Sequence, residues 1–210
     1  MRRPVGASVL VPAATGLAVA GLLAVAGLWT DDGAGAGAGA GAGTGAGRPN
    51  AIAAAAGATV MDPGTRQEAP ALAGADLDGR QVALGDFRGE VVVLNAWGSW
   101  CGPCRAEADD LERLSRETRG DGVRFLGINT RDRDRAAARS FVRAHDLTFP
   151  SLHDPEGELL LRFPPSLVNP QAIPSTLVID RRGRVAAAIG GAVTDEQLRP
   201  LLARVLQEQS

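Results

Sequence analysis

The chain has 210 residues, a formal net charge of −2 at pH 7 and a pI of about 5.7. This length accommodates one domain of ordinary size together with appended segments. The balanced charge offers no basic field to a nucleic-acid backbone, so the composition excludes nucleic-acid binding.

The N-terminal segment, residues 4–29, is apolar and almost uncharged, and it follows Arg2 and Arg3. A helix of about 20 apolar residues spans a bilayer. Basic residues before such a helix and acidic residues after it place the following chain outside the cytoplasm. We therefore predict a signal anchor within residues 1–30 and a single-pass protein of the cell membrane. The alternative is a cleaved signal peptide, which would release a secreted protein.

Residues 31–67 begin with a Gly-Ala repeat that extends to Gly47. Glycine-rich chains lose much conformational entropy on ordering and offer few side chains to bury. This composition is typical of a flexible linker. We predict that the folded domain occupies residues 68–208.

The first part of this domain is expected to contain a β-hairpin, a strand and a helix. Residues 77–80 form a turn signal, and residues 81–84 alternate like the second arm of a hairpin. Residues 91–96 are apolar and rich in valine, which predicts a strand buried on both faces. Residues 103–118 lack glycine and carry apolar side chains at helical spacing, which predicts a helix.

The remaining elements alternate between strands and helices. In chain order they are a strand over 123–129, a helix over 134–144, a short strand over 148–153, a short apolar element over 159–163, a hairpin of strands over 175–180 and 185–189, and a final helix that begins at Thr194. Gln197 can complete a capping box with Thr194. The βαβ rhythm predicts an α/β domain with a central mixed sheet flanked by helices.

The chain has two cysteines, Cys101 and Cys104, which follow the buried strand in a Trp-Cys-Gly-Pro-Cys run. The same spacing is half of a zinc site, but such sites normally need four ligands, and the two histidines lie far along the chain without ligand spacing. A static disulfide is the other alternative, although so short a loop restricts the unfolded chain little. We predict a redox-active dithiol without a metal or another cofactor.

The start of a helix gives the two thiols different roles. Unpaired N–H groups and the helix dipole stabilise a thiolate at Cys101, which is predicted to be the nucleophile. Cys104 lies one turn further into the helix, where we expect it to be less exposed and to act as the resolving thiol. Gly102 and Pro103 preset a tight turn between them and are expected to contact the substrate.

Glu107 follows Cys104 by three residues, so it is expected on the same side of the helix. If its carboxyl is buried near the sulfurs, its pKa is raised and it can act as a general acid or base for Cys104. The alternative is a solvent-exposed Glu107 that pairs with Arg105 or Arg113.

Two tryptophans flank the loop before the dithiol: we assign Trp97 to the core and Trp100 to an apolar platform around the sulfurs. Further along the chain, Ile173 and Pro174 precede a buried strand. A cis peptide bond at Pro174 would bring the backbone of Ile173 beside the sulfurs. We therefore expect Trp100 and Ile173 to contact the substrate.

Three segments carry a resemblance to a known family: residues 95–107 around the dithiol, residues 173–176 and residues 180–183. In order and spacing they resemble the TlpA/ResA-like branch of the thioredoxin superfamily, over roughly residues 68–208. The resemblance implies a thioredoxin-like fold with an N-terminal β-hairpin and a central βα insertion.

The resemblance also implies the site residues. Cys101 is then the nucleophile, Cys104 the resolving thiol, Glu107 the acidic active-site residue and Pro174 the cis-proline opposite the sulfurs. Members of this branch are typically exported, membrane-tethered thiol-disulfide oxidoreductases. They often reduce apocytochrome c thiols before haem attachment and are recharged by a membrane electron donor.

The chain departs from the family pattern at two positions. Ala96 stands where the family often has an aromatic residue, and Asp109 stands where it often has a proline. Without that proline the active-site helix has no sequence reason to kink, and an additional carboxylate lies near Glu107.

Three functions fit these features. The leading one is a reductase that acts outside the cytoplasm on the disulfides of exported proteins, apocytochrome c among them. The second is an oxidase that donates disulfides to secreted proteins; the Gly-Pro dipeptide matches that of reducing thioredoxins but does not set the direction. The third is a redox-inert tethered binding module or chaperone that uses the groove beside Trp100 and Pro174.

Overall fold

The computed structural model describes residues 57–208. The predicted signal anchor, residues 4–29, lies outside the described residues, as does most of the predicted linker. Among the helices of the described part of the chain, none combines the length and the apolar character that crossing a membrane requires.

A six-stranded mixed sheet, with the order β1-β8-β7-β4-β5-β6, forms the centre of the fold. Its strands are β1 (Ala58–Val60), β4 (Val91–Trp97), β5 (Val123–Thr130), β6 (Ser151–Asp154), β7 (Ser175–Ile179) and β8 (Val185–Gly190). β4, β5 and β6 are parallel, whereas β7 is antiparallel to both β4 and β8. Every residue of β4 is buried, because this strand lies in the middle of the sheet with both faces covered.

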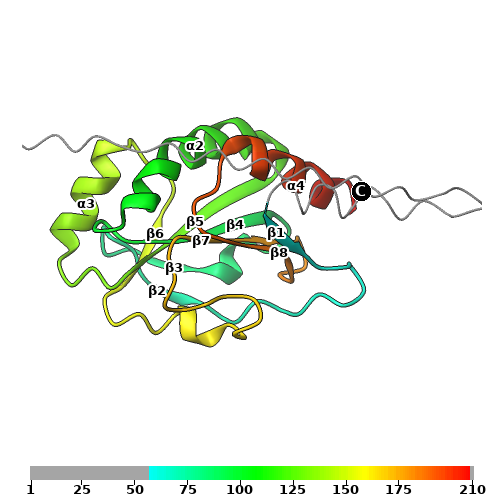
Figure 1. Ribbon diagram of the computed structural model, residues 1–210, viewed down its shortest axis with the longest axis horizontal. Coiled ribbons are helices and arrows are strands. Elements are labelled where there is room, and N and C mark those ends of the chain that lie inside the picture. Colours follow the sequence, from blue (N-terminus) through cyan, green and yellow to red (C-terminus); the bar gives the residue numbers. More distant parts are fainter. Residues whose placement is uncertain (1–56, 209–210) are drawn as a thin grey trace, which may run out of the picture. The chain divides into compact units, whose positions relative to one another are not determined.

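Helices and short segments cover the two faces of the sheet (Figure 1). The helices are α2 (Gly102–Thr118), α3 (Arg135–Ala144) and α4 (Asp195–Gln207), and the short 3-10 helices are η1 (Leu84–Phe87), η2 (Arg119–Asp121) and η3 (Leu160–Arg162). A separate antiparallel hairpin consists of β2 (Ala73–Ala75) and β3 (Gln81–Ala83). In Figure 1, α2 and α4 lie above the sheet, and the hairpin and η3 lie below it.

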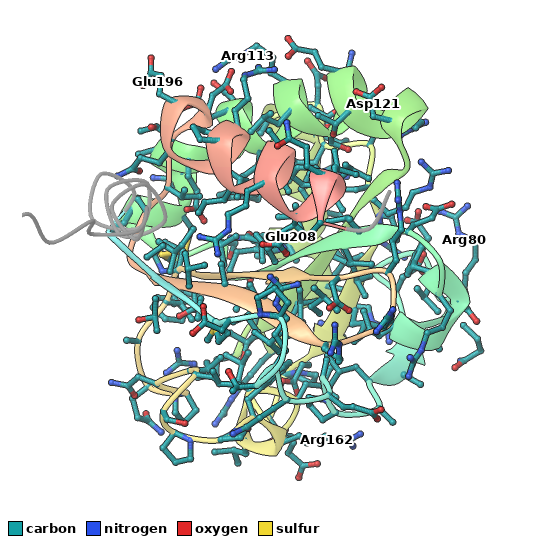
Figure 2. The ribbon with its side chains drawn as sticks, turned by 90° about the vertical axis from the view of Figure 1, so that its right-hand side faces the viewer. Arg80, Arg113, Asp121, Arg162, Glu196 and Glu208 are labelled. Carbon is teal, nitrogen blue, oxygen red and sulfur yellow. A yellow bond between two sulfur atoms is a disulfide. The ribbon has the colours of Figure 1, made fainter. Side chains whose placement is uncertain are left out.

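Two apolar clusters correspond to these two faces. On the face of α2 and α4, Leu111 and Leu198 belong to one cluster with Val93 of the sheet. On the opposite face, Leu94 belongs to a second cluster with Leu160 of η3. Figure 2 labels one exposed arginine of each layer, Arg113 on α2 and Arg162 in η3, above and below the sheet. Because successive side chains of a strand point to opposite faces, Val93 and Leu94 of β4 pack against different layers.

The helices begin where their sequences predict. Thr194 precedes α4, and its backbone N–H donates to the Gln197 side chain at 3.0 Å, as the capping box requires. Asp134 caps α3 by accepting from Ala136 N–H at 2.8 Å. The predicted α/β arrangement, with a hairpin before β4 and a central insertion of α3 and β6, is confirmed in the described residues.

The start of the folded chain requires a correction. β1 lies within residues 31–67, which the sequence assigns to a linker, and it pairs with β8 at the edge of the sheet. Arg66 is buried as well, and its guanidinium pairs with Asp180 at 3.3 Å. The order of this segment depends on partners more than 100 positions away, for which the local composition carries no signal.

Candidate active site

The two cysteines lie at the junction between β4 and α2. Cys101 is the N-cap of α2, and its sulfur accepts a hydrogen bond from the backbone N–H of Cys104 at 3.1 Å. The two sulfurs form a disulfide of 2.06 Å. Pro103 occupies the first turn, where the missing N–H of proline costs no helical hydrogen bond. The strand-turn-helix placement predicted for the dithiol is therefore present.

Exposure differs little between the two sulfur residues. Cys101 is 4% exposed and Cys104 is 1% exposed, so the expected difference has the predicted sign but is small. Trp100, directly before Cys101, is 55% exposed and is one of the largest apolar side chains on the surface. Trp100 thus presents an exposed apolar side chain next to Cys101 in the sequence.

The segment that precedes β7 lies against Cys101. The Ile173–Pro174 peptide bond is cis, and the carbonyl oxygen of Ile173 lies 3.9 Å from the sulfur of Cys101. The carbonyl of Pro174 accepts a hydrogen bond from Gly191 N–H at 2.9 Å, which fixes this segment to the end of β8. Two regions separated by about seventy positions in the sequence thus meet at the disulfide.

Glu107 is buried on the side of α2 that faces the sheet. It is 2% exposed, and its Oε1 accepts from Asn95 Nδ2 at 2.8 Å, while its Oε2 accepts from Val193 N–H at 2.9 Å. The alternative, an exposed Glu107 paired with an arginine, is wrong: Arg113 pairs with Asp110 and Asp195 instead.

Burial determines the protonation of Glu107 in the disulfide form. Loss of hydration raises the pKa of its carboxyl from 4.5 to about 7, although the hydrogen bonds from Val193 and Asn95 oppose this rise. A carboxyl with this pKa exchanges protons readily near neutral pH. Since Glu107 lies one helical turn from Cys104, it can serve as the proton acceptor or donor of the buried thiol.

The site contains three further hydrogen-bonding groups whose role the sequence pattern did not predict. They are the side chains of Asn95 and Thr176 and the backbone N–H of Val193. Asn95 lies in β4, and its amide donates to Thr176 Oγ1 at 3.1 Å as well as to Glu107. Val193 contributes only its backbone N–H, from the loop before α4. An asparagine within an otherwise apolar buried strand is the one local signal that could have indicated a polar partner in the core.

The two tryptophans separate as expected. Trp97 is 2% exposed, stacks on Phe141 of α3 and donates from Nε1 to Ser151 Oγ at 3.2 Å. Trp100 lies on the surface, where the guanidinium of Arg131 lies 5.2 Å from the centre of its ring. The assignment of Trp97 to the core is confirmed.

Gly98 allows the indole of Trp100 to approach the backbone closely. A Cβ atom at Gly98 would lie 2.8 Å from Trp100 Nε1 and 3.3 Å from Ile173 Cδ1. These distances bring Trp100 and Ile173, the two predicted substrate contacts outside the Gly-Pro turn, together around one glycine. The side chain of any other residue at position 98 would displace one of them.

The additional carboxylate of Asp109 does not join the site. Its Oδ1 lies 2.7 Å from Nδ1 of His145, at the end of α3, and its side chain is largely exposed. Asp109 and Glu107 therefore point to different sides of α2, which runs as one continuous helix from Gly102 to Thr118. Within residues 57–208, no group of three or more His, Cys, Asp or Glu side chains is arranged to hold a metal ion.

Known proteins share extended sequence similarity with this chain. The model of the AhpC/TSA family matches residues 65–188. The thiol-disulfide oxidoreductase ResA from Bacillus thuringiensis subsp. konkukian is 34% identical over 139 residues, which cover 66% of this chain and 77% of the relative.

Solved structures of similar proteins share the fold. A secreted thiol-disulfide isomerase from Corynebacterium glutamicum superposes with a TM-score of 0.65 at 36% identity, covering 71% of this chain and 92% of that one. A DsbF homologue from Corynebacterium diphtheriae gives a TM-score of 0.62 at 35% identity, covering 70% and 92%. The thioredoxin-like fold is thereby confirmed. The chain belongs to the AhpC/TSA family of the thioredoxin superfamily, and it is a thiol-disulfide oxidoreductase of the ResA type.

Proposed function

We propose that this enzyme reduces the disulfides of exported proteins outside the cytoplasm. The observation that carries the proposal is the arrangement of a Cys101–Cys104 disulfide at the start of α2 with a buried carboxyl, that of Glu107, one turn behind Cys104. Such a carboxyl can take up the proton of a buried resolving thiol, which otherwise reacts slowly because only thiolates attack disulfides.

In the proposed reaction the reduced enzyme attacks first through Cys101. Its thiolate forms a bond to one sulfur of the substrate disulfide, and the other substrate sulfur leaves as a thiolate. Cys104 then transfers its proton to Glu107 and attacks the sulfur of Cys101. This second step releases the other substrate thiolate and forms the Cys101–Cys104 disulfide, so two electrons pass from the enzyme to the substrate.

Several surface groups near the sulfurs are suited to hold the substrate in this reaction. Trp100 offers an exposed apolar face, and Gly102 and Pro103 form the turn between the cysteines. The backbone of Ile173, turned toward Cys101 by the cis peptide bond at Pro174, can pair with an extended substrate segment.

The proposed location and partners rest on the N-terminal sequence and on the relatives. Residues 4–29 would anchor the chain in the membrane, and a membrane electron donor would return the Cys101–Cys104 pair to its reduced form. One solved relative is described as secreted. Among exported substrates we propose apocytochrome c, whose thiols must be reduced before haem attachment, as for other members of the ResA-like branch.

The reduction potential of the Cys101/Cys104 pair tests the direction of the reaction. The full-length protein is equilibrated with defined mixtures of reduced and oxidised thiol buffer, and the fraction of disulfide is measured. A value near that of thioredoxin, about −270 mV, is expected for a reductase. A value near −120 mV would refute the proposal and would favour an oxidase that donates disulfides to secreted proteins.

A further inference from the structure

The loop before the dithiol is held by the loop that follows β5. Ser99 donates from its backbone N–H and from its hydroxyl to the two carboxylate oxygens of Asp132, each at 2.7 Å. The neighbouring Arg131 lies over the ring of Trp100, the neighbour of Ser99. Arg131 and Asp132 of one loop thus contact Trp100 and Ser99 of the other.

Asp132 is a buried carboxylate that accepts hydrogen bonds from the loop before the dithiol and from the end of its own strand. It is 5% exposed, and its third hydrogen bond comes from Asn129 Nδ2 at 2.7 Å. All three donors are uncharged groups. Burial of a carboxylate is unfavourable unless hydrogen bonds compensate for the lost hydration, so the position of Asp132 depends on Ser99.

Arg131 shows that this part of the chain is under constraint. Its φ angle of 59° lies in the left-handed region, which non-glycine residues seldom adopt. The conformation is held by a hydrogen bond from Arg131 N–H to Asp154 O at 2.9 Å. Two guanidinium nitrogens of Arg131, Nε and Nη2, are buried without a hydrogen-bond partner among the described residues. Strained backbone that the surroundings enforce is common beside functional sites.

We propose that Asp132 is a positioning residue for disulfide exchange. Together with Arg131 it fixes Ser99 and Trp100, so that Cys101 caps α2 and the indole stays beside Gly98. Release of the loop lets the sulfur of Cys101 move away from the N–H of Cys104, which weakens the stabilisation of the Cys101 thiolate. This role of Asp132 lies in the exchange step itself and is the same whichever protein disulfide reacts with the enzyme.

The two substitutions Asp132→Asn and Asp132→Ala separate geometry from charge. The asparagine oxygen can accept from Ser99 N–H and Asn129, and its amide can donate to the Ser99 hydroxyl, which accepts as readily as it donates. D132N therefore keeps all three contacts without the charge, whereas D132A loses all three. Asp134→Asn is the matched control, because Asp134 is an exposed N-cap on the same loop and asparagine caps helices equally well.

The test uses the full-length protein, with equilibration against glutathione and with insulin as the disulfide substrate. For D132A we expect the equilibrium constant with glutathione to shift about tenfold, about 30 mV toward more negative potential. We also expect kcat/KM for insulin to fall about tenfold, because misplaced reacting groups slow the reaction. D132N should stay within about threefold of the wild type in both measurements, and D134N should match the wild type.

Two results would overturn the proposal. In one, D132A lowers the melting temperature but leaves the potential and kcat/KM unchanged, which is the behaviour of a merely structural residue. In the other, D132N changes the reduction potential and kcat/KM as much as D132A does. The charge of Asp132, and not the position of the loop, would then determine both quantities. If D132A does not fold, Ser99→Ala replaces it. S99A removes the hydroxyl contact alone, so we expect smaller shifts of the reduction potential and of kcat/KM in the same directions. If neither quantity shifts in S99A, the proposal is overturned.

Discussion

Asn95 and Glu107 are joined by a hydrogen bond of 2.8 Å that runs from the strand before the dithiol to the helix after it. Val193 donates to the other oxygen of the same carboxyl at 2.9 Å. Both partners are N–H donors, which favour the ionised form, yet burial outweighs them and the pKa of Glu107 rises to about 7. The site therefore holds a carboxyl that is half protonated near neutral pH.

Replacing Glu107 with glutamine should make the stability of the disulfide form less dependent on pH. Glu107 binds its proton more tightly in the folded state, where its pKa is about 7, than in the unfolded state, where it is 4.5. The unfolding free energy of the wild type therefore falls as pH rises from 4.5 to 7. E107Q should be the more stable protein at pH 8, by at most about 3 kcal/mol, and nearly equal at pH 4.

Urea denaturation of both proteins at pH 4 and pH 8 measures this difference. Asp109→Asn is the control, since it removes a carboxylate from the same helix at a position that is largely exposed. D109N should change the unfolding free energy little at either pH. A stability difference between E107Q and the wild type that is the same at both pH values would contradict the raised pKa of Glu107.

Replacing Cys104 with serine should trap the substrate on Cys101. Without the resolving thiol, the mixed disulfide formed by Cys101 has no internal nucleophile to break it. After mixing reduced C104S with insulin or another protein disulfide, we expect a covalent complex on a non-reducing gel. C101S should form little complex, because Cys104 lies inside the helix and lacks the N-cap position that stabilises a thiolate at Cys101. A stronger complex with C101S than with C104S would reverse the two roles.

Replacing Gly98 with alanine should weaken substrate binding. The added methyl group meets the indole of Trp100 at 2.8 Å and must displace it from its place beside Ile173. We expect KM for a protein disulfide to rise several-fold, with a smaller change in kcat, since the sulfurs themselves stay in place. Gly85→Ala provides the control, because nothing lies within 4 Å of a Cβ atom there. A G98A enzyme with unchanged KM would show that Trp100 does not contact the substrate.

Replacing Asp180 with asparagine should destabilise the domain far from the active site. Burial raises the pKa of Asp180, but hydrogen bonds from Arg184 and Arg66 outweigh it and hold the pKa below its ordinary value of 3.8. Its contribution to stability is thus present above pH 3.8 and is lost as the pH falls further. At pH 7, D180N leaves the buried Arg66 with one carboxylate fewer and should cost about 3 kcal/mol.

The unfolding free energy of D180N and wild type at pH 7 and pH 3 checks this. The difference should shrink at pH 3. Asp78→Asn is the control, because Asp78 forms an exposed pair with Arg80 and such pairs contribute little. Equal losses for D180N and D78N at pH 7 would contradict a structural role for the buried pair.

Local sequence patterns predicted those parts of the molecule whose causes are local. The run of buried residues in β4, the capping box of α4, and the Cys-x-x-Cys spacing each depend on neighbours within one or two turns. The side of α2 that carries Glu107 also follows from spacing alone. The burial of Glu107 does not follow from local spacing, because it requires Val193, which lies 86 positions later in the chain.

Two other features could not be predicted from the sequence, because they also depend on residues far away in the chain. β1 is three residues long and gains its order from β8, so the composition of its surroundings predicts a linker. Asp132 lies in a run of alternating arginine and aspartate, residues 131–135, which is typical of an exposed charged surface. Its burial against Ser99 results from the pairing of β4 with β5, which brings the ends of the two strands together.

The register of β1 determines at which end of the sheet the described chain begins. Ala58 lies opposite Ile189, next to Gly190, and Gly190 lies opposite Ser175, which follows the cis-proline. The described chain therefore starts at the same end of the sheet as the disulfide. Three strand spacings separate β1 from β4, about 14 Å. The first described strand therefore completes the edge of the sheet at the end where the reacting sulfurs lie, so the entry of the chain into the domain and the site of disulfide exchange share one end of the fold.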